Sequence, residues 1–315
     1  MIMEKYNMDY VFGNENRKAY MGLAMIWIIG YHFYLVHSDF INHYLFPVKF
    51  LFRNGYVGVD IFFILSAFGL CYSWERSTVT CFYKKRFIRI IPLYLVFLVL
   101  CKFLLKADFS YWDVFLQITS LSVLNTPYTH TQGINGEWFV PAIINLYVIF
   151  PVLFNLVRYL NKRFAVYGVY IVSMCSILAS GGASSFISPN YIMRLPIIVA
   201  GILAYLCIIE NNKRKLLQIF VFMAIFYLFV ERKNIMLSVP LPLILFTLNE
   251  LKFKMNIKWL CFIGSISFEL YLAHVIPMNF IQNYNIAISA LIMLICTAVI
   301  ASLLHGLNLL VSKLK

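Results

Sequence analysis

The chain has 315 residues, of which 62% are hydrophobic and only 12% charged, and its mean hydropathy is +0.81. Soluble globular domains carry about 25% charged residues, so this composition excludes a soluble enzyme, a disordered chain and a disulfide-stapled secreted domain. The net charge of +13 needs no nucleic-acid partner, because membrane proteins collect Lys and Arg at their cytoplasmic side. We therefore predict an all-α, polytopic integral membrane protein.

Ten apolar stretches are candidates for membrane-spanning helices. The predicted spans are 19–37, 56–74, 87–106, 138–158, 164–180, 190–209, 216–231, 235–249, 259–281 and 286–311. The run 111–124 is too short and too polar for a span, and we interpret it as an interfacial or re-entrant helix. It lies in the longest non-spanning stretch, about 107–137, whose length and turn-forming residues are typical of a functional loop.

The distribution of basic residues predicts the orientation of these spans. If the N-terminus is cytoplasmic and the spans alternate, most of the Lys and Arg residues fall on the cytoplasmic side, as the positive-inside rule requires. An even number of spans then leaves both termini in the cytoplasm. We predict a single transmembrane domain over residues 1–315, with the 107–137 loop on the outer side.

Ionisable side chains inside an apolar span are costly and often functional. His32, in the first span, is a candidate general base because imidazole titrates near neutral pH; a packed structural histidine is the alternative. Arg17 lies fifteen residues earlier on nearly the same helical face, as a catalytic partner or as a charge anchor. Asp60, at the start of the second span, either orients such a group or forms a structural ion pair.

A second group of candidates lies where the third span begins. Arg86 and Arg89 are i, i+3 neighbours on one helix face, and Lys85 directly precedes them. Guanidinium groups suit phosphate oxygens, which accept two parallel hydrogen bonds. The group therefore indicates a clamp for a phosphorylated ligand, although a charge anchor at the membrane surface would use the same residues.

Polar residues also interrupt the ninth span, at Ser267, Glu269 and His274. A ligand site and a polar packing network account for them equally well. The seven cysteines form no CxxC pair, and we expect no metal site.

Four motifs follow one another along the chain: GYVGVDIFFILSAFGL, FYKKRFIRIIPLYL, WFVPAIINLYVIFP and IGSISFELYLAH. In this order they resemble the membrane acyltransferase-3 family, which includes bacterial sugar O-acetyltransferases. The resemblance runs from about residue 17 to residue 280. It is to the short, single-domain branch rather than to the branch with an extra periplasmic hydrolase-like domain.

The resemblance implies transfer of an acyl group, usually acetyl from acetyl-CoA, to a hydroxyl of a glycan or glycolipid. It implies that His32 is the histidine of the first-span Arg…His motif, and that Arg86 and Arg89, with Lys85 beside them, contact the CoA phosphates. We favour His32 as a general base over His32 as an acyl carrier. The residues expected to bind the acceptor are Glu137, Trp138, Tyr147, Ser267, Glu269 and His274.

Two positions depart from the family pattern. In many relatives the first-span arginine lies eleven residues before the histidine, where this chain has Met21, and Arg17 lies one turn closer to the cytoplasm. In many relatives the motif of Trp138 and Tyr147 also carries a glutamate, and here that position is Ile143.

The competing function is a transporter or flippase for a lipid-linked glycan, which would also have many spans and buried charges. It would often show two repeated halves, and the sequence shows none. We expect the protein to lie in the bacterial cytoplasmic membrane, with a glycan or glycolipid acceptor, the lipid bilayer and no nucleic acid as partners. The acceptor, an acetyl or succinyl donor group, and self-association into a homo-oligomer stay open.

Overall fold

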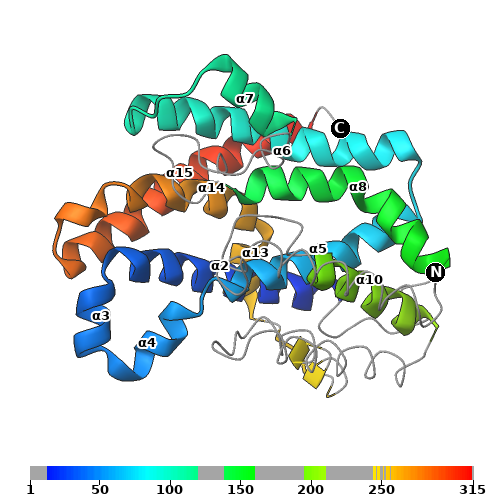
Figure 1. Cartoon of the computed structure of the whole chain (residues 1–315), viewed down its shortest axis with the longest axis horizontal. Coiled ribbons are helices and arrows are strands. Elements are labelled where there is room, and N and C mark those ends of the chain that lie inside the picture. The colour runs from blue at the N-terminus through cyan, green and yellow to red at the C-terminus, as the bar shows by residue number, and fades with distance from the viewer. Residues whose placement is uncertain are drawn as a thin grey trace, which may run out of the picture. The chain divides into compact units, whose positions relative to one another are not determined.

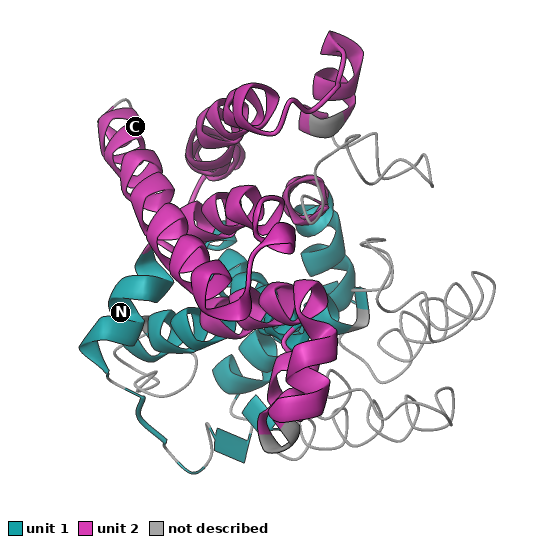
Figure 2. Ribbon diagram, turned by 90° about the vertical axis from the view of Figure 1, so that its left-hand side faces the viewer, with its two compact units in different colours: residues 1–24, 56–76, 149–265 teal, residues 25–55, 77–148, 266–315 magenta. Residues whose placement is uncertain are grey.

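A computed structural model describes residues 13–119, 138–159 and 195–210, and, toward the C-terminus, residues 244–245, 247–248, 251, 253–255 and 257–313. Every regular element within these residues is a helix (Figure 1). The chain divides into two compact units (Figure 2). Unit 1 comprises residues 1–24, 56–76 and 149–265, and unit 2 comprises residues 25–55, 77–148 and 266–315.

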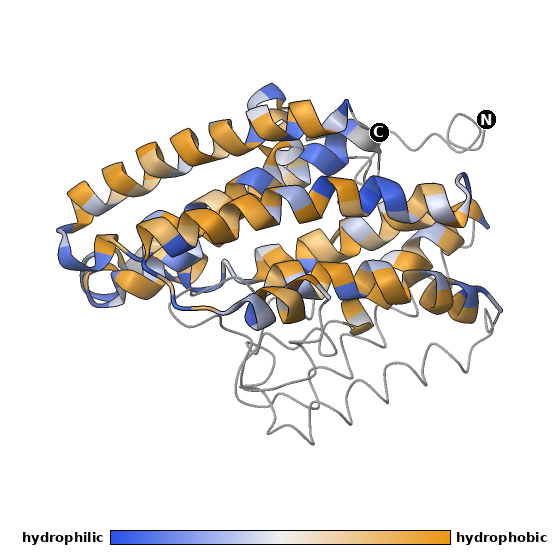
Figure 3. Ribbon diagram, turned by 90° about the horizontal axis from the view of Figure 1, so that it is seen from above, coloured by the Kyte–Doolittle hydropathy of each residue, from blue (hydrophilic) through white to orange (hydrophobic). Residues whose placement is uncertain are grey.

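Five of the described helices are long and apolar enough to cross a membrane, or six if one bent pair counts as a single span. The five are α2 (Asn14–Val36), α5 (Val57–Trp74), α6 (Val79–Leu104), α8 (Phe139–Tyr159) and α15 (Ile286–Ser312). Hydrophobic residues follow one another along these helices (Figure 3). The all-helical membrane fold is thus confirmed.

Four predicted spans lie partly or wholly outside the described residues. The stretches 164–180 and 216–231 are outside entirely, and 235–249 is outside except for four residues. Of 190–209 the structure describes α10 (Leu195–Ile209), which is shorter than a full span. The count of ten spans and the cytoplasmic position of both termini therefore stay predictions.

The ninth predicted span is not one continuous helix. It is divided into α13 (Lys258–Ser265) and α14 (Ser267–Met278), with a bend at Ile266. The Ser265 hydroxyl donates to the Phe262 carbonyl oxygen at 2.7 Å, and such back-bonding favours a bend. The backbone of Ile266 has φ −109° and ψ 20°, outside helical values, which ends the first helix and starts the second.

The third predicted span begins about two turns earlier than residue 87. The hydroxyl of Thr78 accepts a hydrogen bond from the Cys81 amide at 3.4 Å and caps α6 at its N-terminus. The basic residues around Arg86 thus belong to the first turns of α6 rather than to a preceding loop. They are held on a helix, where their directions are set by its periodicity.

Three short helices flank the long ones in unit 2. They are α3 (Ser38–Tyr44) and α4 (Phe46–Arg53), which the sequence reading missed, and α7 (Tyr111–Ile118), which lies within the predicted 111–124 helix. The start of α7 is a capping box: the Ser110 amide and hydroxyl each donate to the Asp113 carboxylate at 2.7 Å.

Unit 1 is built on close helix crossings at glycine. The first turns of α2 cross α13, with Gly22 against the Leu260 carbonyl and Gly264 against the Lys18 carbonyl. Helix α10 packs on α5, where Gly201 approaches the Ile64 backbone. Without water to drive burial, membrane helices associate through such small-residue contacts.

In unit 2, α14 packs against α15 and against α6. Its side chains are buried almost without exception, from Ser267 to Met278. This position matters for function, because α14 carries two of the ionisable residues singled out above, Glu269 and His274, and both are fully buried.

Candidate functional site

Two histidines from opposite ends of the chain meet inside unit 2. The Nδ1 atom of His32 on α2 lies 3.0 Å from the Nε2 atom of His274 on α14. The ring centroids are 4.9 Å apart. His274 is fully buried, whereas His32 keeps part of its surface exposed. We call these two residues the histidine pair.

The hydrogen-bond partners of the histidine pair determine where its protons lie. The Nδ1 atom of His274 is 3.2 Å from the Leu270 carbonyl oxygen, which can only accept. Nδ1 of His274 therefore carries the proton, and its Nε2 accepts in the neutral ring. The bond between the rings is then donated by Nδ1–H of His32, which leaves the lone pair of His32 on Nε2.

This tautomer gives the two residues different roles. His32 is oriented by His274 and has an unprotonated Nε2, the atom that a general base requires. If Nε2 of His32 takes a proton, its Nδ1–H still donates to His274, so the ring keeps its orientation in both states. His274 contacts His32 directly and can hold the direction of its ring.

Aromatic side chains of unit 2 surround the histidine pair. Tyr271, one turn before His274, packs edge-on against it with ring centroids 5.3 Å apart, and Phe139 of α8 lies 4.8 Å from Tyr271. Tyr31 lies 5.4 Å from the His32 ring. Tyr31 thus packs beside His32, and Tyr271 packs beside His274.

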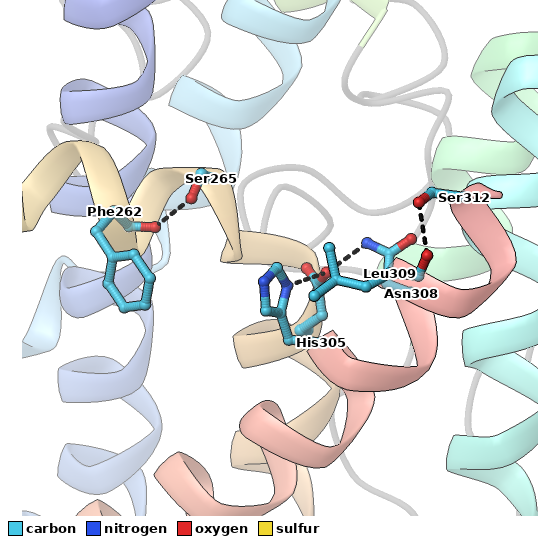
Figure 4. Close-up of polar contacts among 7 residues, drawn as sticks. Phe262, Ser265, His305, Asn308, Leu309 and Ser312 are labelled. Carbon is cyan, nitrogen blue, oxygen red and sulfur yellow. Dashed lines mark hydrogen bonds and ion pairs between the residues drawn. The ribbon is translucent and has the colours of Figure 1, made fainter.

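Glu269 lies on the same helix as His274 but turns to another partner. Its Oε1 atom accepts a hydrogen bond from Asn308 Nδ2 at 2.6 Å, and His305 Nδ1 is 3.5 Å away. Figure 4 shows the side chains of His305 and Asn308 reaching from α15. The Oε2 atom of Glu269 is buried and has no hydrogen-bond partner within the described residues. The carboxylate thus ties α14 to α15.

The two arginines at the start of α6 differ in exposure. Arg89 is exposed, and so is Lys85, whereas Arg86 is half-buried. The guanidinium of Arg86 lies 4.0 Å over the Phe82 ring, and its Nη1 donates to the Phe82 carbonyl oxygen at 3.1 Å. Its Nε atom is buried without a partner in the part of the chain that the structure describes.

Tyr147 of α8 interacts electrostatically with both arginines. The adjacent residue fixes this arrangement, because the Tyr83 hydroxyl of α6 donates to the Val148 carbonyl oxygen at 3.1 Å. The sequence assigned Tyr147 to the acceptor. The structure brings Tyr147 to the side of Arg86 and Arg89, and its assignment to the acceptor stays a prediction.

Unit 1 holds the other two residues predicted from the first two spans. Asp60 is fully buried in the first turn of α5. The Arg17 guanidinium lies beside Gly69 of α5, at the place where a Cβ atom would be if residue 69 had one.

The remaining candidates are less informative. Glu137 lies outside the described residues, and Trp138 directly precedes α8. Ser267 is buried at the first position of α14. In the described part of the chain, no three His, Cys, Asp or Glu side chains are grouped so that they could hold a metal ion.

The sequence analysis did not single out His305 and Asn308, the two residues of α15 that contact Glu269. Both are polar residues in the last apolar span, three residues apart and so on one helix face. The rule that polar groups inside a span need a partner would have singled them out.

Comparison with protein families supports the motif resemblance. The acyltransferase-3 family model, described as an acyltransferase domain, matches residues 22–307. No curated protein and no solved structure matches the chain. Because the family model covers most of the sequence, and five of the described helices are long and apolar enough to cross a membrane, the chain belongs to the acyltransferase-3 family of membrane acyltransferases.

Proposed function

We propose that the protein transfers an acetyl group from cytoplasmic acetyl-CoA to a hydroxyl of a cell-surface glycan or glycolipid, with His32 as the general base. The observation that carries this proposal is the histidine pair: the 3.0 Å bond to His274 leaves Nε2 of His32 unprotonated. An oriented imidazole with a free lone pair is the group that activates a hydroxyl nucleophile.

The reaction balances without a further reagent. Nε2 of His32 takes the proton of the acceptor hydroxyl, and the acceptor oxygen bonds to the carbonyl carbon of the thioester. The carbon–sulfur bond breaks, and the proton passes from His32 to the CoA sulfur. The products are the acetyl ester and the CoA thiol.

The charged residues of α6 suit the donor. Phosphates cannot enter hydrocarbon uncompensated, and the N-terminal turns of α6 carry Arg86, Arg89 and Lys85. Tyr147 lies close to both guanidinium groups. A buried Nε–H of Arg86 that lacks a described partner is a donor available to a phosphate oxygen.

Arg17 and His32 cannot contact the same atoms. They lie fifteen residues apart on one helix, a rise of about 22 Å. We therefore assign Arg17 to the anionic end of the donor rather than to the acyl group.

The function is tested on surface glycans. Glycans are isolated from a deletion strain carrying nothing, the wild-type gene or His32→Ala at matched expression, and O-acetyl groups are measured by mass spectrometry and proton NMR. We expect acetyl esters to vanish on deletion and to return only with the wild type. Glycan that stays on the inner leaflet, with acetylation intact, would instead support a flippase.

The histidine pair is tested by two substitutions at one position. His274→Leu removes the acceptor for Nδ1–H of His32, whereas His274→Gln keeps an oxygen that can accept. We expect about tenfold lower kcat for the first, from one lost hydrogen bond, and partial recovery for the second, with the donor KM unchanged in both. Equal rates in the two variants would contradict the assigned tautomer.

A further inference from the structure

Gly69 faces an unusual neighbour for a helix glycine. A Cβ added at Gly22 or Gly264 would meet backbone carbonyl groups of the crossing helix, as expected where glycine brings two helices together. A Cβ added at Gly69 would meet the end of a charged side chain: Arg17 Nη1 is nearest, with Cζ at 3.2 Å and Nη2 at 3.9 Å. The absent side chain thus leaves a notch in α5 for the guanidinium.

The helix backbone does not explain this glycine. Residue 69 lies inside α5 and has no left-handed backbone. A glycine inside a helix costs about 1 kcal/mol relative to alanine. The Arg17 side chain is what the missing Cβ accommodates.

The guanidinium reaches from α2, which carries Arg17 and His32, to α5, which carries the first of the four motifs. Arg17 lies in the polar first turn of α2, and its side chain is half-buried. Its fork of donors matches phosphate oxygens, and the N-terminal end of α2 adds a positive helix dipole.

We propose that Gly69 is a positioning residue for the acyl donor: by leaving a notch in α5, it holds the Arg17 guanidinium where it binds the phosphates of CoA. This inference rests on the proposed function, which supplies the donor. It accounts for Met21, which stands where many relatives have arginine, because Gly69 makes room for the guanidinium of Arg17, one turn earlier.

The substitution Gly69→Ala separates this role from a structural one. The colliding atoms are the far end of a flexible side chain, which can swing aside, so the fold survives. Only the position of the guanidinium changes. We therefore expect Gly69→Ala to be as thermally stable as the wild type but to bind CoA about tenfold more weakly, the loss of one strong interaction.

The probes are CoA and pantetheine, which lacks the phosphates and the nucleotide, titrated against the full chain in lipid nanodiscs. We expect Gly69→Ala and Arg17→Ala to weaken CoA binding by a similar factor. The double variant should weaken CoA binding no more than either single variant does. Pantetheine binding stays unchanged. Gly306→Ala, at a helix glycine with open space around it, is the matched control and binds both probes as the wild type does.

A shorter cation tests the geometry. Arg17→Lys ends about where Cζ of the arginine lies and has no Nη atoms to collide with a methyl group. Its CoA affinity should therefore be the same with Gly69 and in the Gly69→Ala background. If Gly69→Ala binds CoA like the wild type, or weakens CoA and pantetheine equally, the inference is wrong while the proposed function stands.

Failure of the proposed function gives a different pattern. A wild type that binds CoA but transfers no acetyl group to glycans refutes the acceptor and leaves the Gly69 inference intact. A wild type that does not bind CoA at all overturns both.

Discussion

The crossing of α2 and α13 in unit 1 leaves no room for a side chain at either of its glycines. A Cβ at Gly22 would lie 3.0 Å from the Leu260 carbonyl carbon and 3.1 Å from the Gly264 amide nitrogen, and still closer to the Leu260 oxygen. Ordinary contact begins at 3.4 Å, and these atoms are backbone rather than flexible side chain. Gly22→Ala must therefore push two helices apart.

The cost can be estimated from two opposing contributions. Overpacking costs up to about 3 kcal/mol, and we expect the upper end because backbone cannot move aside alone. Alanine regains about 1 kcal/mol of helix propensity. For a chain of 315 residues, the net loss of about 2 kcal/mol lowers the unfolding midpoint by ~3 °C. Gly264→Ala meets the same crossing from the other side, so the double variant should lose less than both single losses together.

The assay uses the protein's own thiols. The side chains of Cys71, Cys101, Cys207 and Cys261 are buried, so a fluorogenic maleimide reports unfolding in detergent as their thiols become accessible. Gly306→Ala on α15, where nothing lies within 4 Å of an added Cβ, should melt no lower than the wild type. If Gly22→Ala and Gly264→Ala have the same unfolding midpoint as Gly306→Ala, the crossing of α2 and α13 is wrong.

Three local predictions use the same principles. Lys106 has φ 51°, a left-handed backbone that favours glycine. Lys106→Gly should therefore increase the free energy of unfolding by about 1 kcal/mol and raise the unfolding midpoint. Asn285→Ala removes the cap on the Ile288 amide and should cost about 1 kcal/mol in the same thiol melt. The backbone amide and then the hydroxyl of Ser110 lower the pKa of Asp113. Their stabilisation of α7 is therefore complete above the ordinary pKa near 3.8 and is lost as pH falls through the lower folded value. The measurement is amide hydrogen exchange in α7 as a function of pH, and Asp113→Asn should abolish the pH dependence.

The long helices were predictable because hydrophobic length alone determines a span. The predicted stretches 56–74, 138–158 and 286–311 differ from α5, α8 and α15 by a residue at most at each end. Prediction failed for features that hydropathy does not encode. The early start of α6 depends on the Thr78 cap, and the break at Ile266 depends on local backbone geometry within a continuous apolar run.

The candidate site was predictable as a set of residues but not as an arrangement. Buried ionisable groups stand out against apolar sequence, which is why His32, Glu269 and His274 were singled out. Nothing in one sequence says that His274 contacts a residue 242 positions away, or that Glu269, five residues earlier on α14, pairs with α15 instead. Partners across helices are decided by packing, which has no sequence period.

The same limit applies to what a glycine predicts. In a membrane helix, glycine predicts close approach of something, and another helix backbone is the usual neighbour. Gly22 and Gly264 meet that expectation, while Gly69 admits a guanidinium instead. A missing side chain specifies only a volume, and what fills it follows from the rest of the fold. In this chain it is filled by Arg17, the charged residue that departs from the family pattern, which is why Gly69 and Arg17 are best tested together.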